Sequence, residues 1–434
     1  MQIIHIIPGS GGSFYCGNCL RDSKYVDALR SMEHEVIKVP MYLPLFADEH
    51  DLNDIPVFYG AISIYLKQLW PSFRRAPAWM DRLLNSKPAL KLASRLAGST
   101  RAAGLEEMTV SMLLGEDGGQ EEELNQLAGW ISEHCRPDIV HLSNALLLGL
   151  AHRIKEKLNV PVVCSLQDED VWVEAMHPSA SKEVWDLMSR KAAHVDAFIA
   201  VSSHYTQLMK KRLSLPEEKL QCLHLGVAPA DYDYLPASEK PKNIGFLSRM
   251  CRENGLDILI DAFIELKKDP EAAGSQLIIS GGHTRDDTSF LRAQKRKLKR
   301  AGLLHQVDFH EDFEGDGRKE FFKKAAVLSV PVRRGEAFGL YLLEAMASGT
   351  PVVQPRLGAF PEIIATSGGG VTYAPNRPKN LAAALKEVLF HPRQLAGLSQ
   401  AGWNGVEQHF HLDKQASKML SIYEQVIKNI TSCS

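Results

Sequence analysis

The sequence predicts an α/β protein with two Rossmann-like domains, each built on an open parallel sheet. The chain has 434 residues, too many for one ordinary hydrophobic core. Short β-branched runs alternate along it with amphipathic helical segments, which is the pattern of repeated strand–helix–strand units. A proline-rich polar segment at 228–242 interrupts this alternation and indicates a linker between two such series.

The first series begins with an apolar strand at 3–7, a glycine-rich loop and a helix at about 20–31. Its later strands are expected in HEVIKVPMY, PDIVHLSNA, VPVVCSL, DAFIAVSS and KLQCLHLGV. The second series has a helix in LDILIDAFIEL and strands in KNIGFLSRM, SQLIISGG, HQVDFH, AAVLSVPV, TPVVQP and GGVTYA. The last stretch, 403–430, has helical spacing of apolar residues and reads as helix. Because ligands bind outside the carboxyl ends of such strands, we expect the functional residues in the loops there.

Composition and charge argue against several classes of protein. Lys and Arg number 50 and Asp and Glu 52, for a net charge of −2, so no basic field favours nucleic acid. No run approaches the roughly 18–20 apolar residues of a membrane span. The N-terminus lacks the basic and apolar regions of a signal peptide. The seven cysteines are unevenly spaced and indicate no disulfide framework. We therefore expect a cytoplasmic, reduced protein.

A helix in the second series has clear start and stop signals. The preceding strand ends near Val332, and the helix at 340–348 stops at Gly349, a C′ glycine. Glu336 lies just ahead of this helix, and Glu344 lies within it. An N-cap glutamate followed by a solvated helix glutamate is a common pair, and the spacing leaves that alternative open.

The N-terminus of the same helix is also suited to binding an anion. The free N–H groups around Phe338, Gly339 and Leu340 form an anion site that the helix dipole strengthens. A diphosphate would be held there by the backbone, with Gly339 allowing close approach. The two carboxylates would accept hydrogen bonds from hydroxyl groups on either side. The arrangement therefore describes a sugar nucleotide.

The segment GEAFGLYLLEAMASGTPVV, followed by GAFPEII and GGGVTYAP, resembles the E-x7-E region of the family-4 retaining glycosyltransferases of the GT-B fold. In that family the first glutamate contacts hydroxyls of the donor sugar and the second binds the nucleotide ribose. By resemblance, Glu336 and Glu344 take those roles, with the Phe338 and Gly339 backbone at the phosphates. The resemblance also implies retention of configuration, no metal and no cofactor.

The resemblance extends over most of the chain and implies two facing Rossmann-like domains with a cleft between them. The N-terminal, acceptor-binding domain would be 1–228 and the C-terminal, donor-binding domain 229–414. The closing helix, about 415–434, would cross back onto the first domain. The segments ALRSMEHEVIKV, PDIVHLSNA, AVSSHYTQLM and LHLGV match landmarks of the family's first domain.

Other residues match the family in part. Arg249 falls on an arginine that usually grips the diphosphate, whereas Asn254 stands where a lysine is usual. A neutral amide cannot offset phosphate charge, so Arg252, a planar multidentate donor, is the candidate substitute. Solvated arginines at a helix start are the alternative. Gly11 and Gly12 match a Gly-Gly that lies against the donor phosphates, with a tight strand–helix turn as the alternative.

Polar residues follow the strand VPVVCSL. Gln167 stands where the family often carries a histidine near the donor sugar, and it can form hydrogen bonds but cannot titrate. Together with Glu336 and Arg249 it is a candidate catalytic residue. Asp168 and Asp170 spell D-x-D, a metal–diphosphate motif of a different glycosyltransferase fold, which the surrounding landmarks disfavour. Asp168 and Glu169 are candidates for contact with the acceptor.

Two further segments have no assigned role. Cys16 and Cys19 form a lone CxxC near a helix start, where packing is a better explanation than redox activity or zinc. Residues 64–104 carry eight basic side chains against one acidic, interleaved with aromatic residues. Such a segment suits an anionic membrane surface or an acidic or lipid-linked acceptor. A helical insertion with a solvated basic face is the alternative.

The sequence therefore predicts a metal-independent hexosyltransferase that acts on a nucleotide-diphosphate sugar. Its acceptor would be a glycan, a lipid-linked compound or a small molecule, and the protein would be cytoplasmic or peripheral to the inner face of the membrane. Asn254 and Gln167 prompt a first alternative, a sugar-nucleotide-binding protein without turnover. A sugar-nucleotide epimerase on the same scaffold is the second. A phosphorylase would need a pyridoxal lysine site, which the sequence does not place.

Overall fold

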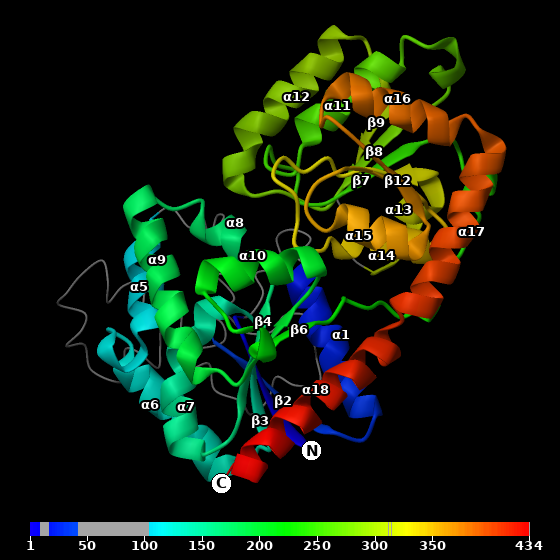
Figure 1. Ribbon diagram of the computed structural model, residues 1–434. Helices are drawn as coiled ribbons and strands as arrows, with labels where there is room; N and C mark the ends of the chain where they lie inside the picture. The colour runs from blue at the N-terminus through cyan, green and yellow to red at the C-terminus, as the bar shows by residue number, and fades with distance from the viewer. Residues whose placement is uncertain (9–16, 42–103, 311, 314, 434) are drawn as a thin grey trace. The chain divides into compact units, whose positions relative to one another are not determined.

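The computed structural model describes residues 1–8, 17–41, 104–310, 312–313 and 315–433 (Figure 1). The chain forms two compact units. The first runs to Leu223 and includes the C-terminal stretch from Ala416, and the second is built from His224–Gln415. Residues Gly11, Gly12 and Cys16 lie outside the described residues, as does 64–103, so the predictions for them are not addressed by the structure.

The first unit contains a parallel sheet. Its described strands are β1 Gln2–Ile7, β2 Glu35–Pro40, β3 Ile139–Leu142, β4 Val162–Leu166, β5 Ala197–Ala200 and β6 Leu220–Cys222. They lie in the order β2-β1-β3-β4-β5-β6, and Ile3 of β1 lies opposite both Val36 and Ile139. The strands β3, β4 and β5 are buried at every residue. This is why they read in the sequence as continuous apolar runs, since both faces of the sheet are covered.

Helices cover both faces of this sheet. They are α1 Gly17–Ser31, α5 Glu106–Leu114, α6 Glu121–His134, α7 Ala151–Leu158, α8 Glu169–Val173, α9 Pro178–Lys191, α10 Ser203–Leu213 and the larger part of α18 Leu412–Cys433. In Figure 1, α1 and α18 lie on one side of the sheet and α5, α6, α7 and α9 on the other. The carboxyl ends of the strands therefore lead into loops between two helical layers.

The second unit repeats this architecture. Its described strands are β7 Ile244–Leu247, β8 Leu277–Ser280, β9 Val307–Phe309, β10 Val327–Leu328, β11 Val352–Pro355 and β12 Gly370–Tyr373, in the order β12-β11-β10-β7-β8-β9. All pairs are parallel. The strand order reverses between β7 and β10, because the chain returns across the sheet after β9. The predicted fold of two Rossmann-like parallel-sheet units is confirmed.

The helices of the second unit also form two layers. They are α11 Leu256–Leu266, α12 Thr288–Arg300, α13 Gly315–Lys324, α14 Leu340–Ala347, α15 Phe360–Ser367, α16 Pro378–Leu389 and α17 Pro392–His409. In Figure 1, α11, α12 and α16 lie on one side of the sheet and α13, α14 and α15 on the other. The helix predicted in LDILIDAFIEL has the bounds of α11. Among the helices that the structure describes, none combines the length and apolarity that crossing a membrane requires.

The closing stretch, 403–430, is helical as predicted but contains a break that was not predicted. The helices α17 and α18 are separated by Phe410 and His411. The backbone there pairs with Val227, whose N–H donates to the Phe410 carbonyl at 3.0 Å and whose carbonyl accepts from the Leu412 N–H at 2.9 Å. Phe410 is fully buried. A tertiary backbone contact has therefore interrupted a sequence whose apolar spacing continues through the break.

The segment predicted as a linker, 228–242, is a fixed part of the second unit. Lys240 Nζ donates to the Ser348 carbonyl at 2.7 Å and to the Thr350 hydroxyl at 2.6 Å, just beyond the C-terminal end of α14. The N–H of Ala237 donates to Ser399 Oγ at 3.1 Å. Lys240 is buried, and this burial lowers the pKa of its amine to about 7. The segment 228–242 is therefore packed against the second unit.

This buried amine makes the stability of the second unit depend on pH. Between pH about 7 and about 10 the unfolded chain binds a proton at Lys240 that the folded protein releases, so stability rises with pH in this window. The slope is at most about 1.4 kcal/mol per pH unit. We expect Lys240→Met to flatten this rise, measured as the urea unfolding midpoint at several pH values. Equal slopes in the two proteins would contradict the assignment.

Candidate functional site

The turn between β10 and α14 contains three backbone N–H groups without a described acceptor. Gly339 is the N-cap of α14 and has a φ of 91°, in the left-handed region that favours glycine. A Cβ atom there would lie 3.1 Å from the Phe360 ring and 3.3 Å from Glu336 Oε2. Within the described residues, the N–H groups of Phe338, Gly339 and Leu340 donate no hydrogen bond. The first turn of a helix leaves such N–H groups without an intrahelical acceptor.

Glu336 lies beside this turn and is fixed by two neighbours. The hydroxyl of Tyr341 donates to Glu336 Oε2, and the Glu336 carbonyl accepts from the Ala359 N–H at 3.0 Å. Gly358 packs so closely that a Cβ atom would lie 2.4 Å from the Glu336 nitrogen. The loop between β11 and α15 therefore fixes the Glu336 backbone. Because the N-cap of α14 is Gly339, Glu336 is not a simple capping residue.

Glu344 is fully buried, which excludes a solvated helix glutamate. Its Oε1 accepts from Arg318 Nη1 and from the Tyr232 hydroxyl, each at 2.9 Å. Burial, together with the charge of Glu344, raises the pKa of Tyr232 well above its usual value, so its hydroxyl remains a donor. Arg318 and Tyr232 therefore both hold one oxygen of this buried carboxylate.

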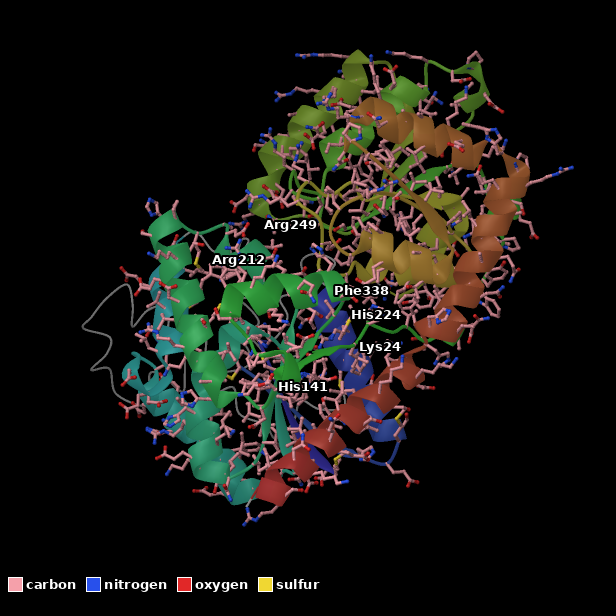
Figure 2. The ribbon with its side chains drawn as sticks, in the orientation of Figure 1. Lys24, His141, Arg212, His224, Arg249 and Phe338 are labelled. Atoms are coloured by element: carbon pink, nitrogen blue, oxygen red, sulfur yellow. The ribbon has the colours of Figure 1, made fainter. Side chains whose placement is uncertain are left out.

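Arg249 follows β7 and is half-buried (Figure 2). Its Nε donates to Asp287 Oδ2 at 2.9 Å and its Nη2 to Asp287 Oδ1 at 3.1 Å. Nη2 also donates to the Thr284 hydroxyl at 3.1 Å. Burial opposes the charge, but the hydrogen bonds to Asp287 outweigh it and raise the pKa of Arg249. Arg249 is therefore one half of an oriented ion pair.

Asn254 and Arg252, both in the loop after β7, have different environments. Asn254 Nδ2 donates to Ser248 Oγ at 2.7 Å and to the Arg249 carbonyl at 3.2 Å, so it braces its own loop. Arg252 is exposed, and its guanidinium makes no hydrogen bond to any described residue. Its carbonyl accepts from Arg333 Nε at 3.0 Å. The loops after β7 and β10 are thus joined next to the candidate site.

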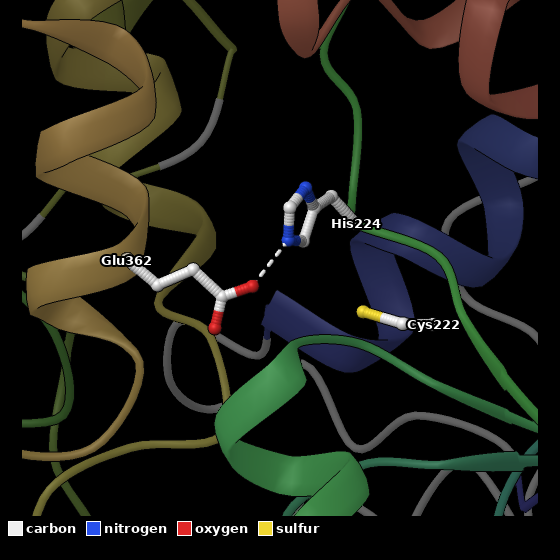
Figure 3. A group of neighbouring side chains, drawn as sticks. All are labelled: Cys222, His224 and Glu362. Atoms are coloured by element: carbon white, nitrogen blue, oxygen red, sulfur yellow. Dashed lines mark hydrogen bonds and ion pairs between the residues drawn. The ribbon is translucent and has the colours of Figure 1, made fainter.

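A histidine–glutamate pair supports the same turn and was missed in the sequence. His224 Nε2 lies 2.6 Å from Glu362 Oε1 in the first turn of α15 (Figure 3). The His224 ring centroid lies 5.9 Å from that of Phe338 and 5.4 Å from that of Phe410. Cys222, also drawn in Figure 3, is the last residue of β6 in the first unit. In the sequence, His224 lies in LHLGV and Glu362 in GAFPEII, and both segments were noted only for their resemblance to the family.

In the first unit, Gln167 is buried at the end of β4 and held at both ends of its amide. Arg21 of α1 donates to Gln167 Oε1, and Gln167 Nε2 donates to the Ser143 carbonyl at 2.6 Å. Arginine only donates and a carbonyl only accepts, so these partners fix the orientation of the amide. Arg21 also donates to Ser165 Oγ at 2.7 Å. Arg21 was not identified from the sequence, because its partners lie on distant strands.

This hydrogen-bonded chain continues into the core of the first unit. His141, marked in Figure 2, lies 2.8 Å from Ser165 Oγ through Nε2 and 2.6 Å from the Tyr423 hydroxyl through Nδ1. Its ring stacks on that of His5 at a centroid distance of 4.6 Å. Burial lowers the pKa of His141 well below its usual value, and it lowers that of His5 to about 3. Both rings are therefore neutral at physiological pH.

The residues predicted on the acceptor side differ in exposure. Glu169 is buried and accepts from the N–H groups of Ala145 at 2.9 Å and Gln167 at 2.7 Å and from the Tyr205 hydroxyl at 2.8 Å. Burial raises the pKa of Glu169 to about 7, although these hydrogen bonds act to lower it. Asp168 is half-buried and has a φ of 59°, in the left-handed region. Of the two, Glu169 braces the loop and Asp168 is the more accessible.

Comparison with known proteins identifies the family. Residues 122–231 match the family described as Glycosyltransferase Family 4, and residues 241–391 match the one described as Glycosyl transferases group 1. The chain is 26% identical over 267 residues to an uncharacterized glycosyltransferase of Methanocaldococcus jannaschii, covering 58% of this chain and 66% of that protein. It is 28% identical over 243 residues to the lipopolysaccharide core biosynthesis mannosyltransferase LpsB of Rhizobium meliloti, covering 55% and 64%. The chain thus spans a little under two thirds of these relatives.

Solved structures share the fold of the whole chain. Sucrose-phosphate synthase from Thermosynechococcus elongatus has a TM-score of 0.73 at 17% identity, over 99% of this chain and 100% of that one. Anabaena HepE, solved in complex with UDP-glucose, has a TM-score of 0.66 at 16% identity, over 100% of both chains. The fold and the matched stretches define a glycosyltransferase of the GT-B class. The chain belongs to glycosyltransferase family 4, as its E-x7-E segment predicts.

The contribution of Glu344 to stability can be tested through its contacts with Arg318 and Tyr232. Glu344→Ala leaves Arg318 and Tyr232 without their buried acceptor, so we expect a loss of about 3 kcal/mol in the free energy of unfolding. Glu387→Ala, at an exposed position of α16, is the matched control and should change it by less than about 0.5 kcal/mol. Urea titrations of the three proteins decide the matter. Equal stabilities would show that the buried ion pair contributes nothing.

Proposed function

We propose that this protein is a retaining, metal-independent glycosyltransferase that moves a hexose-type sugar from a nucleotide-diphosphate sugar to an acceptor hydroxyl. The observation that carries the proposal is the turn at Phe338, Gly339 and Leu340, whose N–H groups are available to an anion. Glu336 lies beside this turn and Glu344 lies in the helix that begins there. A diphosphate with a sugar on one side and a ribose on the other suits this arrangement.

The chemistry that this site supports is departure of the diphosphate. The bond between the anomeric carbon and the diphosphate oxygen breaks, and negative charge grows on that oxygen. The three N–H groups and Arg249 are donors whose positions are fixed before the reaction, which is the most effective way to stabilise such charge. The acceptor oxygen bonds the anomeric carbon on the same face, and its proton passes to the departing diphosphate. Glu336 would orient the sugar through its hydroxyl groups.

The other predicted roles remain part of this proposal. Gly11 and Gly12 would face the donor phosphates, and Arg252 would meet phosphate charge in place of the lysine that Asn254 replaces. Arg21 and Ser143 each use one hydrogen-bonding position of the Gln167 amide, so Gln167 would contact substrate through the remaining positions of Oε1 and Nε2. The acceptor is a glycan, a lipid-linked compound or a small molecule. A cytoplasmic location, contact of 64–104 with an anionic membrane and independence of metal and cofactor belong to the same proposal.

Binding of nucleoside diphosphates tests the proposal first. We expect one of UDP, GDP and ADP to raise the melting temperature of the wild type, since ligand at 100 times its Kd adds about 2.7 kcal/mol to stability. Gly339→Val adds a β-branched side chain to a left-handed residue beside Phe360 and Glu336, and should abolish the shift. Gly274→Val is the control, because no atom lies within 4 Å of a Cβ there. If the wild type binds none of the three nucleotides, the proposal fails.

Product analysis separates the alternatives. With a nucleotide sugar and a panel of hydroxyl acceptors, NMR of the product should show a glycoside with the anomeric configuration of the donor. Glu336→Ala should reduce this transfer at least about a hundredfold while leaving nucleotide binding, because the contact is to the sugar. A nucleotide that binds without transfer or hydrolysis would identify a binding protein. An altered donor sugar formed without any acceptor would identify an epimerase.

A further inference from the structure

The carboxylate of Asp287 has two structural roles: it belongs to the start of α12, and it forms an ion pair with Arg249. Asp287 ends a short 3-10 turn, Arg285–Asp287, and is the N-cap of α12. It accepts from the Thr284 N–H at 2.9 Å, which is its half of a capping box with Thr284, and it also accepts from the Thr284 hydroxyl at 2.7 Å. Asp287 is only 5% exposed. The carboxylate is therefore immobile before Arg249 is considered.

Arg249 contacts this fixed carboxylate through one edge of its guanidinium. The Nε and Nη2 atoms each donate to a different oxygen of Asp287, at 2.9 and 3.1 Å. A bidentate pair of this kind fixes both the plane and the direction of the guanidinium, which a single hydrogen bond would not. Nothing in the capping box requires Arg249, because Thr284 alone closes it. The ion pair therefore orients Arg249, and the start of α12 does not depend on it.

The same ion pair also sets the charge of this part of the site. Burial raises the pKa of Asp287, but the hydrogen bonds from Arg249 and Thr284 outweigh it and hold the pKa below its usual value. The carboxylate is therefore ionised at neutral pH and cancels the formal charge of Arg249. Asn254 adds no charge. A diphosphate that contacts Arg249 would therefore meet an oriented hydrogen-bond donor whose own charge Asp287 neutralises, with Arg252 as the cation of this loop that pairs with no described acid.

We propose that Asp287 is the positioning residue for Arg249 and that it limits affinity for the diphosphate while favouring its departure. The inference rests on the proposed function and assigns a role to a residue outside the E-x7-E segment. A carboxylate that is paired with the guanidinium facing the phosphates would weaken their binding in the ground state. The guanidinium that it aligns acts on the charge that develops as the sugar leaves, so the rate gains more than the binding.

The decisive variant is Asp287→Asn, which keeps the size of the side chain and removes its charge. We expect the nucleoside diphosphate that binds the wild type, among UDP, GDP and ADP, to bind about tenfold more tightly by calorimetry. Release of nucleoside diphosphate from the corresponding nucleotide sugar in water should slow about tenfold, because Arg249 is no longer aligned. Asp261→Asn removes a more exposed acid, which is paired with Lys297, and should change neither value.

A second variant separates alignment from charge. Thr284→Val removes the hydroxyl that contacts both Arg249 and Asp287 but keeps the carboxylate. We expect slower release with unchanged nucleotide affinity, and this result is informative even if Asp287→Asn does not fold. A merely structural role predicts that affinity and rate fall together with the melting temperature, and that outcome overturns the inference. If the wild type binds no nucleotide, the proposed function fails and the inference with it; if it binds and neither variant changes affinity or rate, only the inference fails.

Discussion

The left-handed backbone of Gly339 is the constraint on which the site of the second unit depends. It lets the chain enter α14 with three consecutive N–H groups that no described acceptor uses. Every residue of α14 is buried, so the helix cannot rotate to satisfy these donors elsewhere. A side chain at position 339 would meet both Phe360 and Glu336. The unused donors are thus a fixed property of the fold, of the kind that helix N-termini offer to anions.

Charged residues around this turn are held by partners before any substrate arrives. Glu344 is covered by Arg318 and Tyr232, and Arg249 is aligned by Asp287. Glu336 receives the hydroxyl of Tyr341. In the first unit, Arg21 fixes the amide of Gln167 in the same manner. These side chains are therefore oriented by hydrogen bonds within the protein itself.

Local patterns carry most of the information that the sequence offers. The strands and α11 were predictable because parallel strands covered on both faces leave continuous apolar runs, and the turn at Gly339 because glycine and the flanking acids have a fixed spacing. The break at Phe410 was not, because the contact with Val227 is remote in sequence. For the same reason the partners of the site were missed: Tyr232 lies 112 residues from Glu344, and Arg21 lies 146 residues from Gln167.

A crystal structure of the protein with its bound nucleoside diphosphate tests the central claim most directly. The account predicts phosphate oxygens within about 3 Å of the Phe338, Gly339 and Leu340 nitrogens. It also predicts that Arg318 and Tyr232 move aside and that the ribose hydroxyls reach Glu344. Nucleotide density at another place, with these three N–H groups still unused, would contradict the account.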